Sequence, residues 1–271
     1  MQPREVKTFH MLELNLQDQV ALVTGGSEGI GKAIAYKLAE EGCKIAICAR
    51  RTDVLEATAA QIRDSTGARV LAVAADVTRL EDLERVVSTT LKTCGPVDIL
   101  VNNAGRSAAH SFEQTTEEIW QEDFELKFWA AVRTARLVVP HMKTLGRGAI
   151  VNITHPGGKS PGSASVPTSV SRAAGIAFTK ALSKDLAAHR IRVNTVCLTN
   201  IKSAQGERAW RTSGGTLSYE EWCAKRGQAI PLGRLGEASE VADLVAFLTS
   251  ERAAFITGTA INIDGGESAT T

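Results

Sequence analysis

The stretch that decides the fold spans residues 19–31, QVALVTGGSEGIG. Its first half is an apolar run typical of a buried strand, and its second half is a glycine cluster that opens into an amphipathic segment. Gly25, Gly29 and Gly31 allow a tight turn, a close backbone approach to an anion, and close packing of the helix on the strand. The pattern predicts a helix whose N-terminus faces a dinucleotide pyrophosphate. A glycine-rich turn without a ligand is the alternative.

The same alternation of short apolar runs and longer amphipathic segments continues along the chain. Seven runs rich in Val and Ile are apolar throughout, which is typical of strands buried on both faces of a parallel sheet. Residues 31–41, 54–63 and 80–91 carry apolar side chains at helical spacing. We predict an α/β fold, a Rossmann-type doubly wound parallel sheet of about seven strands with helices on both faces. The expected strands lie within residues 19–26, 44–50, 70–77, 98–105, 149–154, 191–198 and 260–266.

Length and charge exclude several classes of protein. The 271 residues allow one large domain with a sizeable core, so we expect a single domain over residues 1–271, with residues 1–15 as an N-terminal extension. The formal net charge of +1 gives no field that attracts nucleic acid or an anionic membrane. We find no apolar stretch long enough to span a bilayer and no apolar core of a secretory signal near the start, so we expect a cytoplasmic protein.

Cysteine and histidine usage argues against a metal site. The five cysteines are odd in number, widely spaced and never in a Cys-x-x-Cys pair, and the five histidines are scattered. We therefore expect reduced thiols in the core, no disulfide framework and no metal.

The end of the second expected strand bears on the choice of dinucleotide. A carboxylate at this point would bind the ribose 2′-hydroxyl, but the chain has Arg50 and Arg51. Two guanidinium groups suit a 2′-phosphate because each offers a charged fork of donors. The sequence thus favours NADP(H) over NAD(H). A solvated basic turn is the alternative. Glu28 in the glycine loop, residues 24–31, is unfavourable to a nearby phosphate.

Further motifs follow in a characteristic order. They are Asp76-Val77, Asn102-Asn103-Ala104-Gly105, Arg192-Val193-Asn194, Pro231-Leu232-Gly233-Arg234 and residues 257–266, TGTAINIDGG. With TGGSEGIG they resemble the single-domain branch of the short-chain dehydrogenase/reductase family over roughly residues 16–267. The resemblance implies an oxidoreductase with a small-molecule substrate that forms homotetramers or dimers. It assigns to the cofactor Gly25, Ser27, Gly29, Ile30, Gly31, Asp76, Val77, Asn103, Ala104 and Gly105.

The catalytic positions of that family are all changed in this chain. Relatives use a Tyr-x-x-x-Lys pair, a Ser thirteen residues before the Tyr, and an Asn on an earlier helix. Here Thr168 stands at the Tyr, Arg172 at the Lys, His155 at the Ser and Lys127 at the Asn. An aliphatic hydroxyl titrates far above a phenol, and an arginine does not release a proton at working pH. The usual hydride-transfer machinery is therefore absent.

The replacing residues are nevertheless polar and reactive. His155 can act as acid or base near neutral pH, and Lys127 or Lys159 can polarise a carbonyl, act as base or form a Schiff base. Arg172 can hold the nicotinamide ribose. We predict an NADP(H)-dependent oxidoreductase for a carbonyl or alcohol, with a non-standard active site. Two alternatives stay open, namely a lyase, aldolase-like enzyme, dehydratase or isomerase on the same scaffold, and a non-catalytic nucleotide-binding homologue.

Three long segments, residues 106–115, 155–168 and 201–231, show no clear period. Residues 202–230 correspond to the substrate lid of the family. Within them, Trp210, Tyr219 and Trp222 either form an apolar wall for a ring or acyl chain or tie the lid to the domain.

Overall fold

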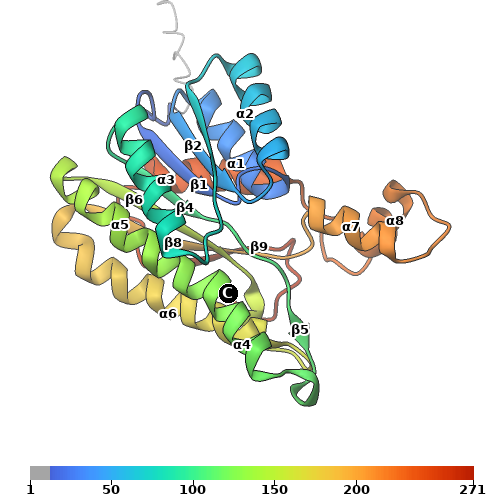
Figure 1. Ribbon diagram of the computed structural model, residues 1–271. Coiled ribbons are helices and arrows are strands. Elements are labelled where there is room, and N and C mark those ends of the chain that lie inside the picture. The colour runs from blue at the N-terminus through green and yellow to red at the C-terminus, as the bar shows by residue number, and fades with distance from the viewer. Residues whose placement is uncertain (1–12) are drawn as a thin grey trace, which may run out of the picture.

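Seven parallel strands form the central sheet of the computed structural model, which describes residues 13–271. Their order is β3-β2-β1-β4-β6-β8-β9, so the chain starts mid-sheet and winds outward in both directions (Figure 1). This confirms the doubly wound sheet that the apolar runs predict. Most of the expected N-terminal extension lies outside the described residues. The strands are β1 Val20–Thr24, β2 Lys44–Ala49, β3 Val70–Ala74, β4 Ile99–Asn102, β6 Gly148–Thr154, β8 Ile191–Leu198 and β9 Ala260–Ile263.

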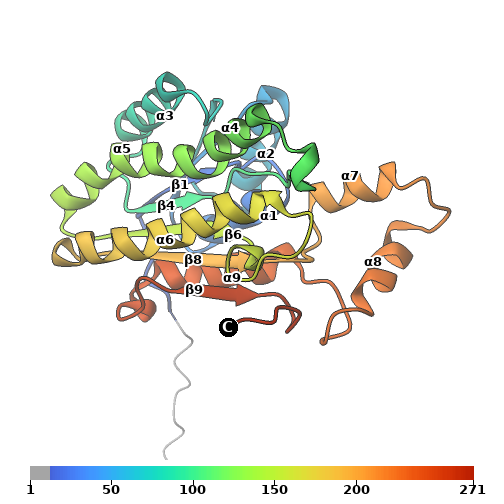
Figure 2. The same cartoon turned by 90° about the horizontal axis from the view of Figure 1, so that it is seen from below.

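Helices cover both faces of the sheet (Figures 1 and 2). One face carries α1 (Gly29–Glu40), α2 (Thr52–Thr66) and α9 (Ala238–Thr249). The other carries α3 (Leu80–Thr93), α5 (Ala130–Leu145) and α6 (Thr168–Leu186). The segments expected to be helical correspond to α1, α2 and α3. Among residues 13–271, no helix combines the length and apolar character needed to cross a bilayer.

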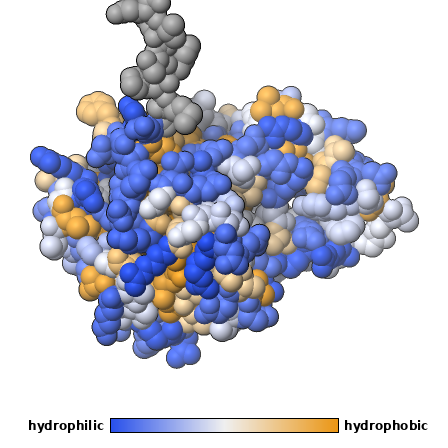
Figure 3. All heavy atoms as spheres, turned by 90° about the horizontal axis from the view of Figure 1, so that it is seen from above, coloured by the Kyte–Doolittle hydropathy of each residue, from blue (hydrophilic) through white to orange (hydrophobic). Residues whose placement is uncertain are grey.

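An apolar layer fills the space on each side of the sheet. Ile34 and Leu38 of α1 pack with Val241 of α9 on one side, and Leu83 and Val86 of α3 are buried on the other. Burial of each such side chain contributes about 1.5–3 kcal/mol to the free energy of folding. The two apolar layers therefore hold the strands, and the loops at their ends, in place. The five cysteines are buried and free, as expected. The face of the molecule seen in Figure 3 is mostly hydrophilic, with apolar side chains in small scattered groups.

Two short strands tie together the loops above the sheet. β5 (Ala109–His110) pairs antiparallel with β7 (Val166–Pro167), immediately before the first residue of α6. Strands of two residues carry no readable period, so the sequence did not predict them. Their pairing brings the segment after β4 against the start of α6, where Thr168 lies.

Residues 201–231 contain two helices, so the expectation of an irregular segment was wrong. α7 (Ala204–Thr212) is capped by the preceding residue, Ser203, whose side chain accepts a hydrogen bond from the Gly206 N–H. α8 (Tyr219–Gly227) begins with a capping box formed by Ser218 and Glu221. Such caps satisfy N–H groups that have no partner within the helix. Both helices project from the body of the molecule (Figures 1 and 2).

Candidate active site

Lys127 and Thr168 meet in the interior although they are far apart in the sequence. The Lys127 Nζ donates to Thr168 Oγ1 at 2.8 Å and also to Asp123 Oδ1. Only 6% of the Lys127 side chain and 1% of the Asp123 side chain are exposed. We refer to Asp123, Lys127 and Thr168 as the lysine centre.

A π-helical turn positions Lys127. Asp123 lies in α4 (Glu117–Phe124), which continues through the π-helical turn η2 (Glu125–Trp129) into α5. Such a turn accommodates one extra residue, changes the direction of the side chains that follow, and is frequent at functional sites. Asp123 and Lys127 are four residues apart, the spacing at which side chains on a helix can pair.

The Thr168 hydroxyl is fully engaged. Its oxygen accepts from the Ala108 backbone N–H at 2.9 Å and from Lys127, and its proton points to Asp123 Oδ1 at 3.4 Å. The second Asp123 oxygen, Oδ2, accepts from Ser171 Oγ at 2.5 Å. Thr168 therefore holds Lys127 in place, whereas the Lys127 ammonium has used two of its three hydrogens on described residues.

Burial changes the acidity of Lys127. It is the largest cause lowering the pKa of this lysine, which falls from 10.5 to about 8. The hydrogen bond to Asp123 raises the pKa, and the charges of Arg172 and Arg106 lower it further. A lysine with such a pKa can exchange a proton near physiological pH, which an ordinary surface lysine does poorly.

His155 follows the end of β6, where its ring accepts a backbone hydrogen bond. Its Nδ1 accepts a hydrogen bond from the Gly157 backbone N–H at 2.9 Å, which leaves the ring hydrogen on Nε2. Burial, and then the charge of Arg172, lower its pKa below the ordinary value of 6.5. The lowered pKa favours the neutral ring, which can donate a hydrogen bond through Nε2.

Arg172 lies one helical turn beyond Thr168 in α6. Its Nε is buried and has no hydrogen-bond partner among the described residues. An unpaired buried N–H of a charged group is costly, and native structures usually supply a partner. A ligand hydroxyl would satisfy it.

Lys159 is not part of this arrangement. Its Nζ donates to the Ala260 carbonyl oxygen and to Asn262 Oδ1, both at 2.6 Å. These bonds tie the segment after β6 to β9, so the contacts of Lys159 are structural ones.

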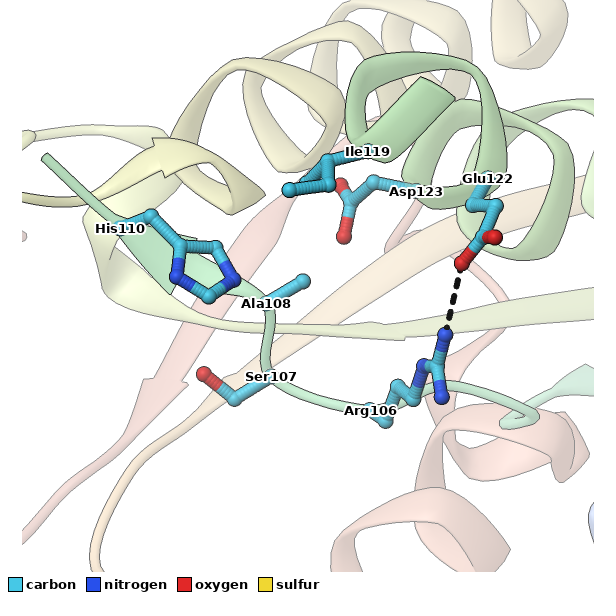
Figure 4. A pocket seen from close by; sticks show the side chains of 7 residues that line it. All are labelled: Arg106, Ser107, Ala108, His110, Ile119, Glu122 and Asp123. Atoms are coloured by element: carbon cyan, nitrogen blue, oxygen red, sulfur yellow. Dashed lines mark hydrogen bonds and ion pairs between the residues drawn. The ribbon is translucent and has the colours of Figure 1, made fainter. Parts of the chain in front are cut away.

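A pocket of about 270 Å³ adjoins the lysine centre (Figure 4). Asp123 and Ile119 reach into it from α4, and the segment after β4 forms the opposite wall. An ion pair of 3.0 Å between Arg106 and Glu122 lies at its edge. The complete lining is Arg106, Ser107, Ala108, His110, Ile119, Glu122 and Asp123. The walls are mainly polar, and Asp123 is the residue shared by the pocket and the centre.

The glycine loop has the geometry that its sequence predicts. Gly25 and Gly29 have φ values of +66° and +53°, in the left-handed region. A Cβ at Gly31 would lie 2.1 Å from the Gly25 carbonyl oxygen. Asn103 fastens the loop because its Nδ2 donates to the Thr24 and Gly25 carbonyl oxygens at 3.0 and 3.1 Å.

The N-terminus of α1 is a candidate site for an anion. Its first turn carries no acidic residue, and its N-cap residue Glu28 makes no side-chain cap. The backbone N of Ala204, at the start of α7, would lie 3.2 Å from a Cβ on Gly29, so two helix N-termini approach the loop. Backbone N–H groups at such ends bind phosphate. Together with the unpaired Nε of Arg172, the residues present fit a dinucleotide.

The other residues assigned to the cofactor lie in the glycine turn, at the start of α1, and in the loops that follow β3 and β4. Ser27 and Val77 are buried. Asp76 accepts through Oδ1 from the N–H and hydroxyl of Thr78, at 3.0 and 2.8 Å. Ile30 is partly buried against the core, and Ala104 N donates to Thr24 Oγ1 at 3.2 Å. A Cβ on Gly105 would lie 3.9 Å from Lys127 Cγ, so this loop connects the two parts of the site.

The two arginines after β2 have different surroundings. Arg51 forms an ion pair with Glu28, and Glu28 also meets Arg208 of α7 at 3.4 Å. Arg50 is exposed at the same strand end. The basic turn is therefore partly neutralised by Glu28.

The lid aromatics pack on one another. The Trp210 and Tyr219 rings are 5.5 Å apart, and Tyr219 stacks on Trp222 at 6.1 Å. The Trp210 Nε1 donates to the Leu217 carbonyl oxygen at 2.9 Å. All of these contacts join residues of the lid to one another, so they hold its two helices together and do not tie the lid to the rest of the domain.

Sequence reasoning missed Asp123 and Ser171. The spacing Asp123-x-x-x-Lys127 on a helix is a signal that could have identified the first. Ser171 carries no such signal, because its contact with Asp123 depends on how α6 packs against α4.

A family model and several known proteins match most of the chain. The family model described as enoyl-(acyl carrier protein) reductase matches residues 25–268. The human protein dehydrogenase/reductase SDR family member 4 is 33% identical over 252 residues, covering 93% of this chain and 88% of that protein.

Two solved structures show the same fold with the dinucleotide bound. L-sorbose reductase from Gluconobacter frateurii, complexed with NADPH and L-sorbose, has a TM-score of 0.90 and 33% identity, covering 96% of this chain and all of that chain. An NADPH-bound short chain oxidoreductase from Pseudomonas aeruginosa PAO1, described as containing an atypical catalytic center, has a TM-score of 0.87 and 33% identity. The match covers 94% of this chain and 98% of that one.

Proposed function

Because the chain belongs to the short-chain dehydrogenase/reductase family of oxidoreductases, we propose that it interconverts a small polar carbonyl compound and its alcohol with NADP(H), using Lys127 as acid and base. The observation that carries this proposal is the hydrogen bond of 2.8 Å between Lys127 Nζ and Thr168 Oγ1. It places a lysine of lowered pKa against the residue that replaces the tyrosine of relatives.

The residues of the site divide the chemistry among them. Lys127 gives its third hydrogen to the substrate oxygen during reduction and takes a proton back during oxidation. His155 donates a hydrogen bond through Nε2 and so orients the carbonyl, as the serine of relatives does. Lys127, Arg172 and Asp123 together carry one net positive charge, which stabilises negative charge on the substrate oxygen.

The dinucleotide supplies the hydride when it is bound. The glycine loop and the N-terminus of α1 would hold its pyrophosphate, and Arg172 would hold the nicotinamide ribose. Arg50 and Arg51 support NADP(H) as the preferred form, as do the NADPH-bound structures of relatives.

The pocket supports a small polar substrate. Its volume of about 270 Å³ and its charged edge, Arg106 and Glu122, suit a hydroxylated ketone better than a long acyl chain. L-sorbose reductase, named for a ketose, is among the similar structures.

The proposal is tested by measuring NADPH oxidation with ketoses, hydroxyketones and a 3-oxoacyl thioester, in the wild type and in Lys127→Met. We expect turnover with a hydroxylated ketone and a loss of about 10²- to 10⁴-fold in kcat in the variant. Lys159→Met is the matched control, because the same substitution there leaves the lysine centre intact. Equal turnover in Lys127→Met, or borohydride trapping of a Schiff base at Lys127 with a keto acid, would contradict the proposal.

A further inference from the structure

Asp123 is a buried carboxylate that none of the family motifs accounts for. Its side chain is 1% exposed, and both oxygens are used, Oδ1 by Lys127 and Oδ2 by Ser171 at 2.5 Å. Burying a carboxylate costs free energy even when it is paired and hydrogen-bonded. Its presence at the wall of the substrate pocket therefore requires a reason.

The surroundings of Lys127 supply that reason. Arg172 faces it from α6, Arg106 from the segment after β4, and His155 from the loop after β6. The charge of Arg172 repels the ammonium, the charge of Arg106 does so as well although Arg106 also pairs with Glu122, and His155 supplies no negative charge. Asp123 is the carboxylate that contacts Lys127 directly.

We propose, resting on the function proposed above, that Asp123 is the positioning residue of the lysine centre: its carboxylate holds the Lys127 ammonium against Thr168 and keeps it charged. The geometry supports both parts. Oδ1 binds Lys127 and accepts from Thr168 at 3.4 Å, so one atom fixes the two partners relative to each other. Ser171 fixes the other oxygen, which prevents the carboxylate from rotating away.

A purely structural role predicts different behaviour. Asp123 also links α4 to α6 through Ser171, and that link alone would stabilise the fold without affecting the charge of Lys127. The two roles are separated by measuring the proton affinity of Lys127 itself. Lysine pKa values can be read from the pH dependence of amine acylation, followed by mass spectrometry of the peptide that contains Lys127.

The experiment compares wild type with Asp123→Asn in the ligand-free full chain. The amide keeps the shape and one acceptor but removes the charge, so the acylation midpoint of Lys127 should fall by about one pH unit or more. The pH at which kcat/KM for reduction begins to fall should move down by the same amount. Glu118→Gln is the matched control, since it removes one charge from the exposed side of the same helix, and it should leave the midpoint unchanged.

An unchanged midpoint in a folded Asp123→Asn protein would overturn the proposal and leave Asp123 a structural role. If that variant does not fold, Asp123→Glu tests the positioning role instead, because it keeps the charge but displaces it by one methylene. We expect kcat to fall about tenfold in Asp123→Glu with little change in KM or in the Kd for NADPH, and an unchanged kcat would overturn the proposal. The acylation midpoint needs no turnover, so it still tests Asp123 if the proposed reaction itself fails.

Discussion

At the scale of single residues, the charge of Lys127 should control the direction of the reaction. Burial lowers its pKa to about 8, so the ammonium prevails below that pH and the amine above it. Reduction requires the ammonium as donor, and oxidation requires the amine as acceptor. We expect kcat/KM for reduction to be constant below pH 8 and to fall above it, with the opposite profile for oxidation. Initial rates in both directions check this, and a reduction profile that stays flat well above pH 8 contradicts it.

Glu28 should weaken the binding of a 2′-phosphate. Its carboxylate pairs with Arg51 and lies in the glycine loop, so it competes with the phosphate for the same guanidinium. We expect Glu28→Gln to lower the Kd for NADPH about threefold and to leave the Kd for NADH nearly unchanged. Calorimetric titration measures both constants, and a higher Kd for NADPH in this variant would be inconsistent with the competition.

The complementary change is Arg50→Ala. Arg50 is exposed and adjoins the ion pair of Arg51 with Glu28. Its removal should raise the Kd for NADPH much more than the Kd for NADH, because only NADPH carries the additional phosphate. An equal effect on the two dinucleotides would remove Arg50 from the recognition of the 2′-phosphate.

At the scale of elements, the start of α1 should tolerate no side chain at Gly31. A Cβ there would lie 2.1 Å from the Gly25 carbonyl oxygen and 2.4 Å from Asn103 Nδ2. We expect Gly31→Ala to lower the free energy of unfolding by about 1–3 kcal/mol, measured by urea denaturation of the ligand-free protein. Gly175→Ala in α6 is the control, because nothing lies within 4 Å of a Cβ at that position, and it should be stabilising by about 0.5–1 kcal/mol. Equal stability of Gly31→Ala and wild type would show that the loop is not closely packed.

The elements of the sheet could be predicted because their patterns are long. Ile34 and Leu38, four residues apart on a helix, reveal the buried face of α1, and the apolar runs reveal both-face burial of the strands. β5 and β7 could not be found, because their pairing depends on tertiary contact between two loops. α8 was missed although Ser218 and Glu221 form a capping box that the sequence displays.

The candidate site could be predicted only in part. The motif spacing located Thr168 and Lys127, and the structure brings these two into contact. It does not bring Lys159 to them, because an amino group on a flexible stem binds whichever acceptors lie nearby, here on β9. Asp123 lay outside every motif, since its importance comes from being buried with a lysine.

At the scale of the whole molecule, Lys127 should make stability depend on pH. Its folded pKa of about 8 lies below the 10.5 of an unfolded lysine, so the unfolded chain binds more protons between these values. The free energy of unfolding should therefore rise with pH through this window in the wild type. It should rise less in Lys127→Met, because that variant lacks the titrating amine. Urea unfolding of both proteins across the window measures the difference, and parallel curves would contradict the lowered pKa.

The dimer or tetramer implied by the family resemblance stays a prediction.

The measurement that most directly tests Lys127 as the proton donor is chemical rescue in single-turnover reduction. Lys127→Ala, saturated with NADPH and a reducible ketone, should reduce it about 10²- to 10⁴-fold more slowly than wild type. Added ethylamine should restore part of that rate, with a pH dependence that follows the ammonium form of the added amine. A wild-type rate in Lys127→Ala, or a slow rate that no amine restores while ethylamine demonstrably binds, would contradict the assignment.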